Sequence, residues 1–221
     1  MAAEDGSDRW FVKRMMKLTR LEKGVMNSAR HARHTEQTVL ALLDHVSLPP
    51  RPRCLEIGCG QGAVTRVLVE RCDAQVVASD YDPAQVAVAQ ERLAGLGGPD
   101  GPVEFRVVDA RAMPFDGAAF DAVFSFGVLH HIPGAWRDAV AEAARVLRPG
   151  GWFVFTELVV SAWASRLAGR LLSRLDRLDE AALRACLARN GLGLAHYTCG
   201  QGEHQAVLGL MDYCAAVARR S

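Results

Sequence analysis

Between Arg53 and Leu158, short apolar runs alternate with stretches that have the spacing of amphipathic helices, and this rhythm restricts the fold strongly. The apolar runs are CLEIG, AQVVASD, VEFRVVD, FDAVFSF and WFVFTEL. We expect helices over 63–71, 82–95, 135–147 and 179–191, and closing strands over 192–200 and 212–219. Such alternation indicates βαβ units, and near-continuous apolar strands indicate burial on both faces. The sequence therefore predicts an α/β fold with a doubly wound, mostly parallel sheet.

Length and charge exclude several classes of protein. The chain has 221 residues, of which 50% are hydrophobic and 23% charged, as in a globular domain. A net charge of +1 gives no sign of a nucleic-acid partner. The start resembles no secretory signal, and no apolar run reaches the ~20 residues of a membrane span, so we expect a cytoplasmic protein. Residues 1–50 are predicted to form a helical cap or lid, and residues 51–221 the main domain.

Cysteine spacing predicts neither a metal site nor a disulfide framework. No pair has the C-x-x-C pattern, and no histidine lies beside a cysteine at zinc-site spacing. We expect free thiols, mostly buried, in a reducing compartment. The six are Cys54, Cys59, Cys72, Cys186, Cys199 and Cys214.

A glycine-rich turn, from Leu55 to Gly62, joins the first predicted strand to the first helix. Glycine lets a ligand approach the backbone closely, and the amides of a helix N-terminus favour an anionic group. The pattern Gly58-x-Gly60-x-x-Ala63 also matches the dinucleotide fingerprint. We expect the three alternating glycines to serve no packing need. The turn therefore predicts either a dinucleotide or S-adenosylmethionine as ligand.

Asp80 ends the second predicted strand, about twenty residues after the turn, where a carboxylate can accept both hydroxyls of a ribose. Both ligands need such a group, so Asp80 does not separate them. Its alternative role is to cap the helix that opens at Pro83, but Asp82 is better placed to do so.

Three further stretches separate the two ligands: DARAMPF at 109–115, FDAVFSFGVLHHI at 120–132 and RVLRPGG at 145–151. With them, the chain from Arg53 to Glu157 resembles class I S-adenosylmethionine-dependent methyltransferases of the small-molecule group, which includes ubiquinone and menaquinone C-methyltransferases and phospholipid N-methyltransferases. The resemblance implies a Rossmann-like, doubly wound, seven-stranded sheet whose last strand is antiparallel, with helices on both faces. It also implies S-adenosyl-L-methionine as cofactor and methyl transfer to O, N, S or C of a small molecule.

The resemblance also implies contacts for the parts of the cofactor. The strand end and the turn would shape its site through Glu56, Gly58, Cys59, Gly60 and Gly62. Asp80 would bind the ribose, and Tyr81 would lie against the adenine. Asp109 would accept the adenine amino group, with a backbone donor from Ala110. The sequence RPGG at 148–151 would be a scaffold turn between a helix and a strand.

The end of the fourth strand would border the reacting groups, through Ser125 and Phe126 beside the methionine moiety. Methyl transfer needs a nucleophile in line with the breaking bond in a site that excludes water, and it needs no metal. A general base matters only for a hydroxyl of high pKa, and the candidates are His130, His131 and Glu157. Neighbouring helical residues point about 100° apart, so at most one histidine should face the pocket. The alternative is that these residues are pocket wall, caps or a solvated strand end.

The flanks of the chain are expected to contact the acceptor. The N-terminal arm would supply a lid through Trp10, Phe11, Met15 and Met16. The segment 161–175 has an apolar face and an arginine face, which is typical of either a membrane-surface helix or a docked helix with a solvated side. The first case would indicate peripheral membrane contact and a lipid or quinone acceptor. The sequence predicts no oligomeric state.

Two other functions stay open on the sequence alone. One is a dinucleotide-dependent oxidoreductase. The other is a protein that binds the cofactor without transferring its methyl group, because Asp80 and Asp109 indicate binding and not transfer.

Overall fold

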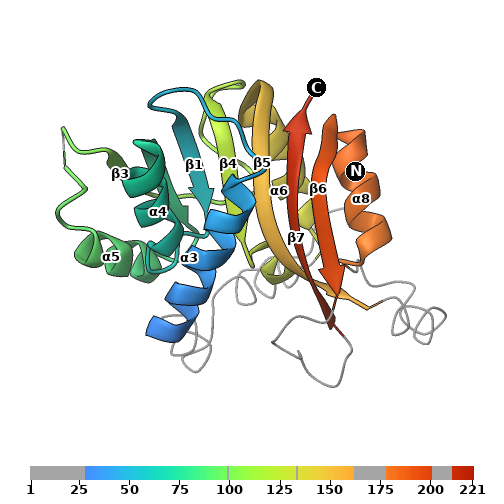
Figure 1. The fold of residues 1–221 in the computed structure, drawn as a ribbon, viewed down its shortest axis with the longest axis horizontal. Coiled ribbons are helices and arrows are strands. Elements are labelled where there is room, and N and C mark those ends of the chain that lie inside the picture. The colour runs from blue at the N-terminus through green and yellow to red at the C-terminus, as the bar shows by residue number, and fades with distance from the viewer. Residues whose placement is uncertain (1–27, 99, 133, 162–177, 201–210) are drawn as a thin grey trace, which may run out of the picture.

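The computed structural model describes residues 28–98, 100–132, 134–161, 178–200 and 211–221, in which strands and helices alternate (Figure 1). The strands are β1 (Arg53–Ile57), β2 (Gln75–Asp80), β3 (Val103–Val107), β4 (Phe120–Phe126), β5 (Leu147–Val160), β6 (Leu192–Gly200) and β7 (Met211–Arg220). The helices are α3 (Ala29–Leu43), α4 (Ala63–Cys72), α5 (Pro83–Arg92), the 3-10 turn η1 (Leu129–His131), α6 (Trp136–Val146) and α8 (Glu180–Arg189). The alternation predicted from the sequence is confirmed.

The strands form one seven-stranded sheet in the order β3-β2-β1-β4-β5-β7-β6. All neighbouring pairs are parallel except those made by β7, which runs antiparallel to both β5 and β6. The predicted fold class is therefore correct, including the antiparallel last strand. The strand order reverses between β1 and β4, and ligands of such sheets bind at the carboxyl ends of the strands beside this switch point. The glycine turn, Asp80 and the end of β4 all lie there.

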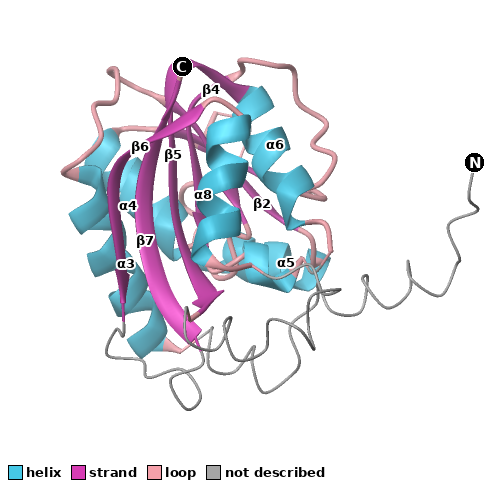
Figure 2. Ribbon diagram, turned by 90° about the vertical axis from the view of Figure 1, so that its right-hand side faces the viewer, coloured by secondary structure: helices cyan, strands magenta, loops and turns pink. Residues whose placement is uncertain are grey.

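Helices cover both faces of the sheet, with α3 and α4 on one side and α6 and α8 on the other (Figure 2). The first side buries Val39 and Leu42 of α3 against strand residues such as Phe124 and Val154. The second side forms a larger apolar cluster around Trp136 and the phenylalanines of β5. Ser28 caps α3, because its side chain accepts a hydrogen bond from the backbone N–H of His31 at 3.2 Å. None of the described helices is long and apolar enough to cross a membrane.

The start of β5 differs from the sequence prediction. We expected a turn at 148–151 and a strand from Trp152, but β5 begins at Leu147, directly after α6. Leu147 pairs with Phe120, and the next pair joins Trp152 to Ala122, so the chain between them bulges out of the ladder. Gly150 takes a φ of +78° in this bulge. The RPGG sequence is therefore a bulge inside a strand, because Leu147 already pairs with β4 before the chain turns.

The expectation of six free thiols is wrong at one pair, since Cys199 and Cys214 form a disulfide. The two residues lie directly opposite each other on the antiparallel strands β6 and β7, which brings their side chains together on one face. Their separation of 15 residues carried no such signal. The other four cysteines are free, and three of them, Cys54, Cys59 and Cys186, are buried.

Candidate active site at the switch point of the sheet

The glycine turn leaves β1 in a conformation that only glycine adopts easily. Gly58 and Gly62 have φ angles of +72° and +84°. A Cβ on Gly58 would lie less than 3.0 Å from Cγ2 of Val128, and a Cβ on Gly62 would lie 2.6 Å from Cδ1 of Leu93. The expectation that these glycines serve no packing need is therefore wrong. They let η1 and α5 pack closely on the turn.

Asp80 is tied to the turn by its carboxylate. Its Oδ2 accepts a hydrogen bond from the backbone N–H of Gly60 at 3.1 Å, and its Oδ1 accepts one from the N–H of Asp82 at 2.8 Å. Asp82 in turn accepts from the N–H of Ala84 at 3.1 Å and is the N-cap of α5, as the sequence predicted. Asp82 is thus the N-cap of α5, whereas Asp80 is the aspartate that binds the glycine turn.

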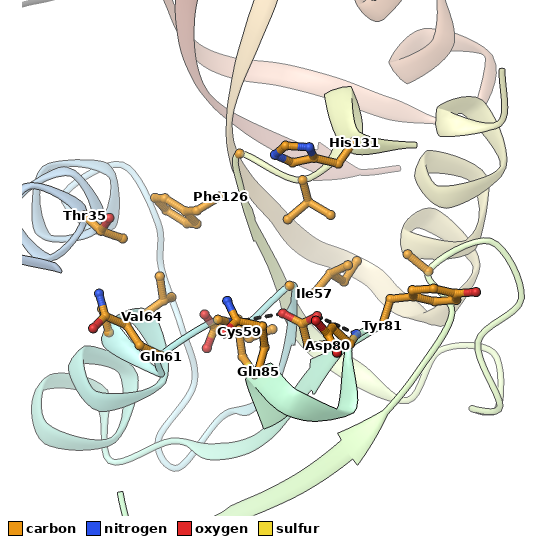
Figure 3. Close-up of a pocket in the computed structure, with 18 of the residues that line it drawn as sticks. Thr35, Ile57, Cys59, Gln61, Val64, Asp80, Tyr81, Gln85, Phe126 and His131 are labelled. Carbon is orange, nitrogen blue, oxygen red and sulfur yellow. Dashed lines mark hydrogen bonds between the residues drawn. The ribbon is translucent and has the colours of Figure 1, made fainter. Parts of the chain in front are cut away.

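A pocket opens where the turn, β2, β4 and α3 meet (Figure 3). Figure 3 shows Asp80, Gln61 and Gln85 near the glycine turn, whereas Phe126, His131 and Thr35 lie farther along the cavity. Nine residues predicted for the site line this pocket: Glu56, Gly58, Cys59, Gly60, Asp80, Tyr81, Ala110, Phe126 and His131. The structure therefore gathers residues from four separate stretches of sequence into one cavity.

The rings of the two neighbouring histidines lie side by side, with centroids 4.1 Å apart, and one of the two lines the pocket, in agreement with the expectation that at most one would. His131 lines the pocket. His130 does not, and its Nδ1 lies 2.8 Å from Oε2 of Glu157. The carboxylate of Glu157 is fully buried and also accepts hydrogen bonds from the backbone N–H groups of Val128 at 2.9 Å, Leu129 at 2.7 Å and His130 at 3.3 Å. Glu157 is thus neither a pocket residue nor a solvated strand end, because it binds the start of η1.

Comparison with known proteins identifies the central part of the chain. Residues 55–155 match the family model described as "Methyltransferase domain". The matched stretch runs from β1 into β5 and so contains the glycine turn, Asp80 and η1.

Curated relatives of this chain are named as methyltransferases. The chain is 37% identical over 120 residues to 27-O-demethylrifamycin SV methyltransferase of Amycolatopsis mediterranei (strain S699), which covers 52% of this chain and 43% of that protein. It is 39% identical over 106 residues to demethylmenaquinone methyltransferase of Clavibacter sepedonicus, which covers 48% of this chain and 40% of that protein. The chain thus spans less than half the length of these two relatives.

A solved structure shares the fold over nearly the whole chain. It is geranyl diphosphate C-methyltransferase from Streptomyces coelicolor A3(2), in complex with Mg²⁺, geranyl diphosphate and S-adenosyl-L-homocysteine. The TM-score is 0.69 at 17% identity, and the match covers 98% of this chain and 99% of that one. At this identity the likeness bears on the fold alone.

Three other residues predicted for the site, Gly62, Ser125 and Asp109, do not line the pocket. Gly62 packs on Leu93, and Ser125 is fully buried with no hydrogen-bond partner for its hydroxyl. Asp109 accepts hydrogen bonds from the guanidinium of Arg111, at 2.9 and 3.2 Å from Nε and 2.7 Å from Nη2. Burial opposes ionisation of Asp109, but the bonds from Arg111 outweigh it and hold its pKa below the usual value. Its neighbour Ala110 lines the pocket instead.

Sequence reasoning missed the contribution of α3. His31 and Thr35 line the pocket one helical turn apart, and they continue the stripe of α3 that buries Val39 and Leu42. This helical spacing was the signal available in the sequence. Polar residues that continue the spacing of the buried Val39 and Leu42 lie on the same face of the helix. The lid residues Trp10, Phe11, Met15 and Met16, and the arginine-faced segment after Ser161, lie outside the described residues.

Glu56 is a buried acid at the floor of the pocket. Its carboxyl group accepts a hydrogen bond from the hydroxyl of Thr65, and its side chain is almost fully buried. Burial raises the pKa of Glu56 to about 8, although the bond from Thr65 acts in the opposite direction. A carboxyl group with this pKa is mostly protonated at neutral pH.

The raised pKa of Glu56 predicts how folding stability depends on pH. The unfolded chain loses this proton near pH 4.5, whereas the folded chain keeps it up to about pH 8. The contribution of Glu56 to stability is therefore full below pH 4.5 and is lost as the pH rises to 8. Thermal unfolding of the wild type and Glu56→Gln at pH 5, 7 and 8.5 measures it. We expect the melting temperature of the wild type to fall relative to that of the variant over this range. A constant difference would contradict the assignment.

Proposed function

We propose that this chain transfers the methyl group of S-adenosyl-L-methionine to a small-molecule acceptor and releases S-adenosyl-L-homocysteine. One observation carries the proposal: a single pocket joins the glycine turn and Asp80 to His131 and Phe126. A cofactor on the turn would thereby share a cavity with an acceptor beside the histidine. The relatives named above support the same class of reaction.

The chemistry of the lining groups fits this cofactor. The carboxylate of Asp80 lines the pocket, and a carboxylate has two oxygens that both accept hydrogen bonds, which suits the two hydroxyls of a ribose. Gly58 and Gly60 offer backbone without side chains to the methionine moiety. Tyr81 and Ala110 would flank the adenine. Cys59 and Glu56 complete the wall of the turn in this proposal.

The protein's own part in the reaction is to position the acceptor and exclude water. When bound, the cofactor supplies a methyl group on a positively charged sulfur. Phe126 and Val128 contribute apolar wall to the pocket, which would hold an acceptor and keep water out. The residues that line the pocket would hold the nucleophilic atom of the acceptor in line with that methyl group. Where the acceptor is a hydroxyl, His131 would receive its proton.

The role of Asp80 is tested by calorimetry with S-adenosyl-L-homocysteine. We expect Asp80→Ala to weaken binding by about 1.5–3 kcal/mol, the range for hydrogen bonds to a charged group, or roughly 10- to 150-fold in Kd. Asp80→Asn keeps one acceptor oxygen and should lose less. An unchanged Kd in a variant that unfolds at the wild-type temperature would refute the ribose contact. Tight binding of NAD without binding of S-adenosyl-L-homocysteine would instead favour the oxidoreductase.

A quinone or lipid acceptor is the second candidate, and the relative named as a demethylmenaquinone methyltransferase favours it. This candidate uses the same pocket and cofactor and differs in the acceptor alone. It predicts that transferred methyl label partitions into organic solvent, whereas a polar metabolite would keep the label in water.

A further inference from the structure

The segment around η1 meets the pocket through side chains and Glu157 through backbone N–H groups. In a 3-10 helix, residues three apart lie above one another. Val128 and His131 are three apart, and both line the pocket. The backbone N–H groups of Val128, Leu129 and His130 all point the other way, to the buried carboxylate of Glu157. The same carboxylate therefore determines which side of η1 the pocket meets.

The strand β5 holds the segment before η1 as well. The backbone N–H of Gly127 donates to the carbonyl oxygen of Thr156 at 2.8 Å, and Glu157 is the next residue along β5. Beyond this anchor, the side chain of Val128 packs against the bare Cα of Gly58. The end of β5 thus sets the position of His131 relative to the cofactor turn through a short chain of contacts.

The contacts of the Glu157 carboxylate suit its role as a hydrogen-bond acceptor. An ionised carboxylate accepts only, and all four of its neighbours here can donate. Burial of such a charge is tolerated when its oxygens are hydrogen-bonded in this way. His130 contacts Glu157 through Nδ1, and its ring lies beside that of His131.

We propose that Glu157 is a positioning residue, which fixes η1 so that the imidazole of His131 faces the methyl-donor end of the cofactor site. This inference rests on the proposed function. In this inference Glu157 takes no direct part in the reaction. It acts through the backbone of Val128, Leu129 and His130.

The charge of the cofactor provides a test that needs no acceptor. S-adenosyl-L-methionine carries a positive sulfur, and S-adenosyl-L-homocysteine has a neutral one. The pKa of His131 is measured by NMR of ¹⁵N-labelled imidazoles in each complex, with His131→Gln to assign the signal. Because a nearby positive charge disfavours protonation, we expect the pKa to be lower by about 0.5–1 unit with S-adenosyl-L-methionine. His130, with a ring centroid 4.1 Å away, and the pocket groups His31, Glu56, Asp80 and Asp82 face the same region in both complexes, so their fixed charges cancel in the difference.

Glu157→Gln is the decisive variant, since it keeps the shape of the side chain and removes its charge. We expect the difference between the two complexes to fall below about 0.2 units, as His131 turns away from the sulfur, while the Kd for S-adenosyl-L-homocysteine changes less than threefold. Glu180→Gln makes the same chemical change at an exposed ion pair with Arg184 and should leave the difference intact. If Glu157→Gln does not fold, Glu157→Asp takes its place in the test. This variant keeps the charge on a side chain one methylene shorter, and we expect the same fall in the difference.

The outcomes separate this inference from the proposed function. An undiminished difference in folded Glu157→Gln or Glu157→Asp overturns the positioning role. So does the absence of any difference in a wild type that binds both compounds, because His131 then does not face the sulfur. Failure of the wild type to bind either compound contradicts the proposed function itself.

Discussion

Replacement of Gly58 by alanine is expected to remove cofactor binding and to destabilise the fold by about 2–5 kcal/mol. The new methyl group would overlap Val128, and overpacking of this kind costs about 1–3 kcal/mol. A φ of +72° adds a backbone penalty of about 1–2 kcal/mol for any residue with a Cβ. Chemical denaturation and calorimetry with S-adenosyl-L-homocysteine measure the two effects.

Two controls separate overlap from backbone strain in that experiment. Val128→Ala in the Gly58→Ala background removes the overlapping methyl groups and should recover part of the lost stability. Gly98→Ala tests a positive φ of +121° where no atom lies within 4 Å of the new Cβ. Wild-type stability and affinity in Gly58→Ala would show that η1 does not pack on the turn as described.

Replacement of Glu157 by alanine should destabilise the protein by about 3–5 kcal/mol, as expected when one partner of a buried, hydrogen-bonded charge is removed. Three backbone N–H groups and the imidazole of His130 would lose their acceptor. An unsatisfied buried donor costs about 1–3 kcal/mol, and water entering the cavity would offset part of the sum. Urea denaturation measures the loss.

Surface and isosteric variants serve as controls for Glu157→Ala. Glu180→Ala breaks an exposed ion pair and should cost less than about 1 kcal/mol. Glu157→Gln should be more stable than Glu157→Ala, because its side chain has nearly the same volume and leaves no cavity. Equal stability of Glu157→Ala and the wild type would mean that the hydrogen bonds to η1 contribute nothing to the fold.

The sheet was predictable because its signals are local. Each of the five apolar runs became a strand, and Asp82 before Pro83 capped α5 as its residue type indicated. The antiparallel last strand came from the family resemblance and not from the spacing of residues. The start of β5 was wrong because proline and glycine normally end an element, whereas here a pair between Leu147 and Phe120 precedes the bulge. That pair depends on a distant strand and leaves no local signal.

The part of the candidate site that sequence motifs define was predictable. The part that depends on packing between separate elements was less so. The glycine turn and Asp80 lie together as the pattern required. The contribution of His31 and the disulfide between Cys199 and Cys214 depend on how separate elements meet, which no single stretch of sequence specifies. The sequence predicted Glu157 to be either a candidate catalytic residue or a solvated strand end. Its neighbours in sequence do not reveal that η1 lies over it.

Transfer of labelled methyl from S-adenosyl-L-methionine into a cell extract tests the central claim most directly. The wild type should transfer label to a small molecule, and Gly58→Ala should not. Label in the organic phase would indicate a quinone or lipid acceptor, and label in water a polar one. A wild type that binds S-adenosyl-L-methionine but leaves both phases unlabelled, across extracts of varied origin, would contradict methyl transfer and indicate a protein that binds the cofactor for another purpose.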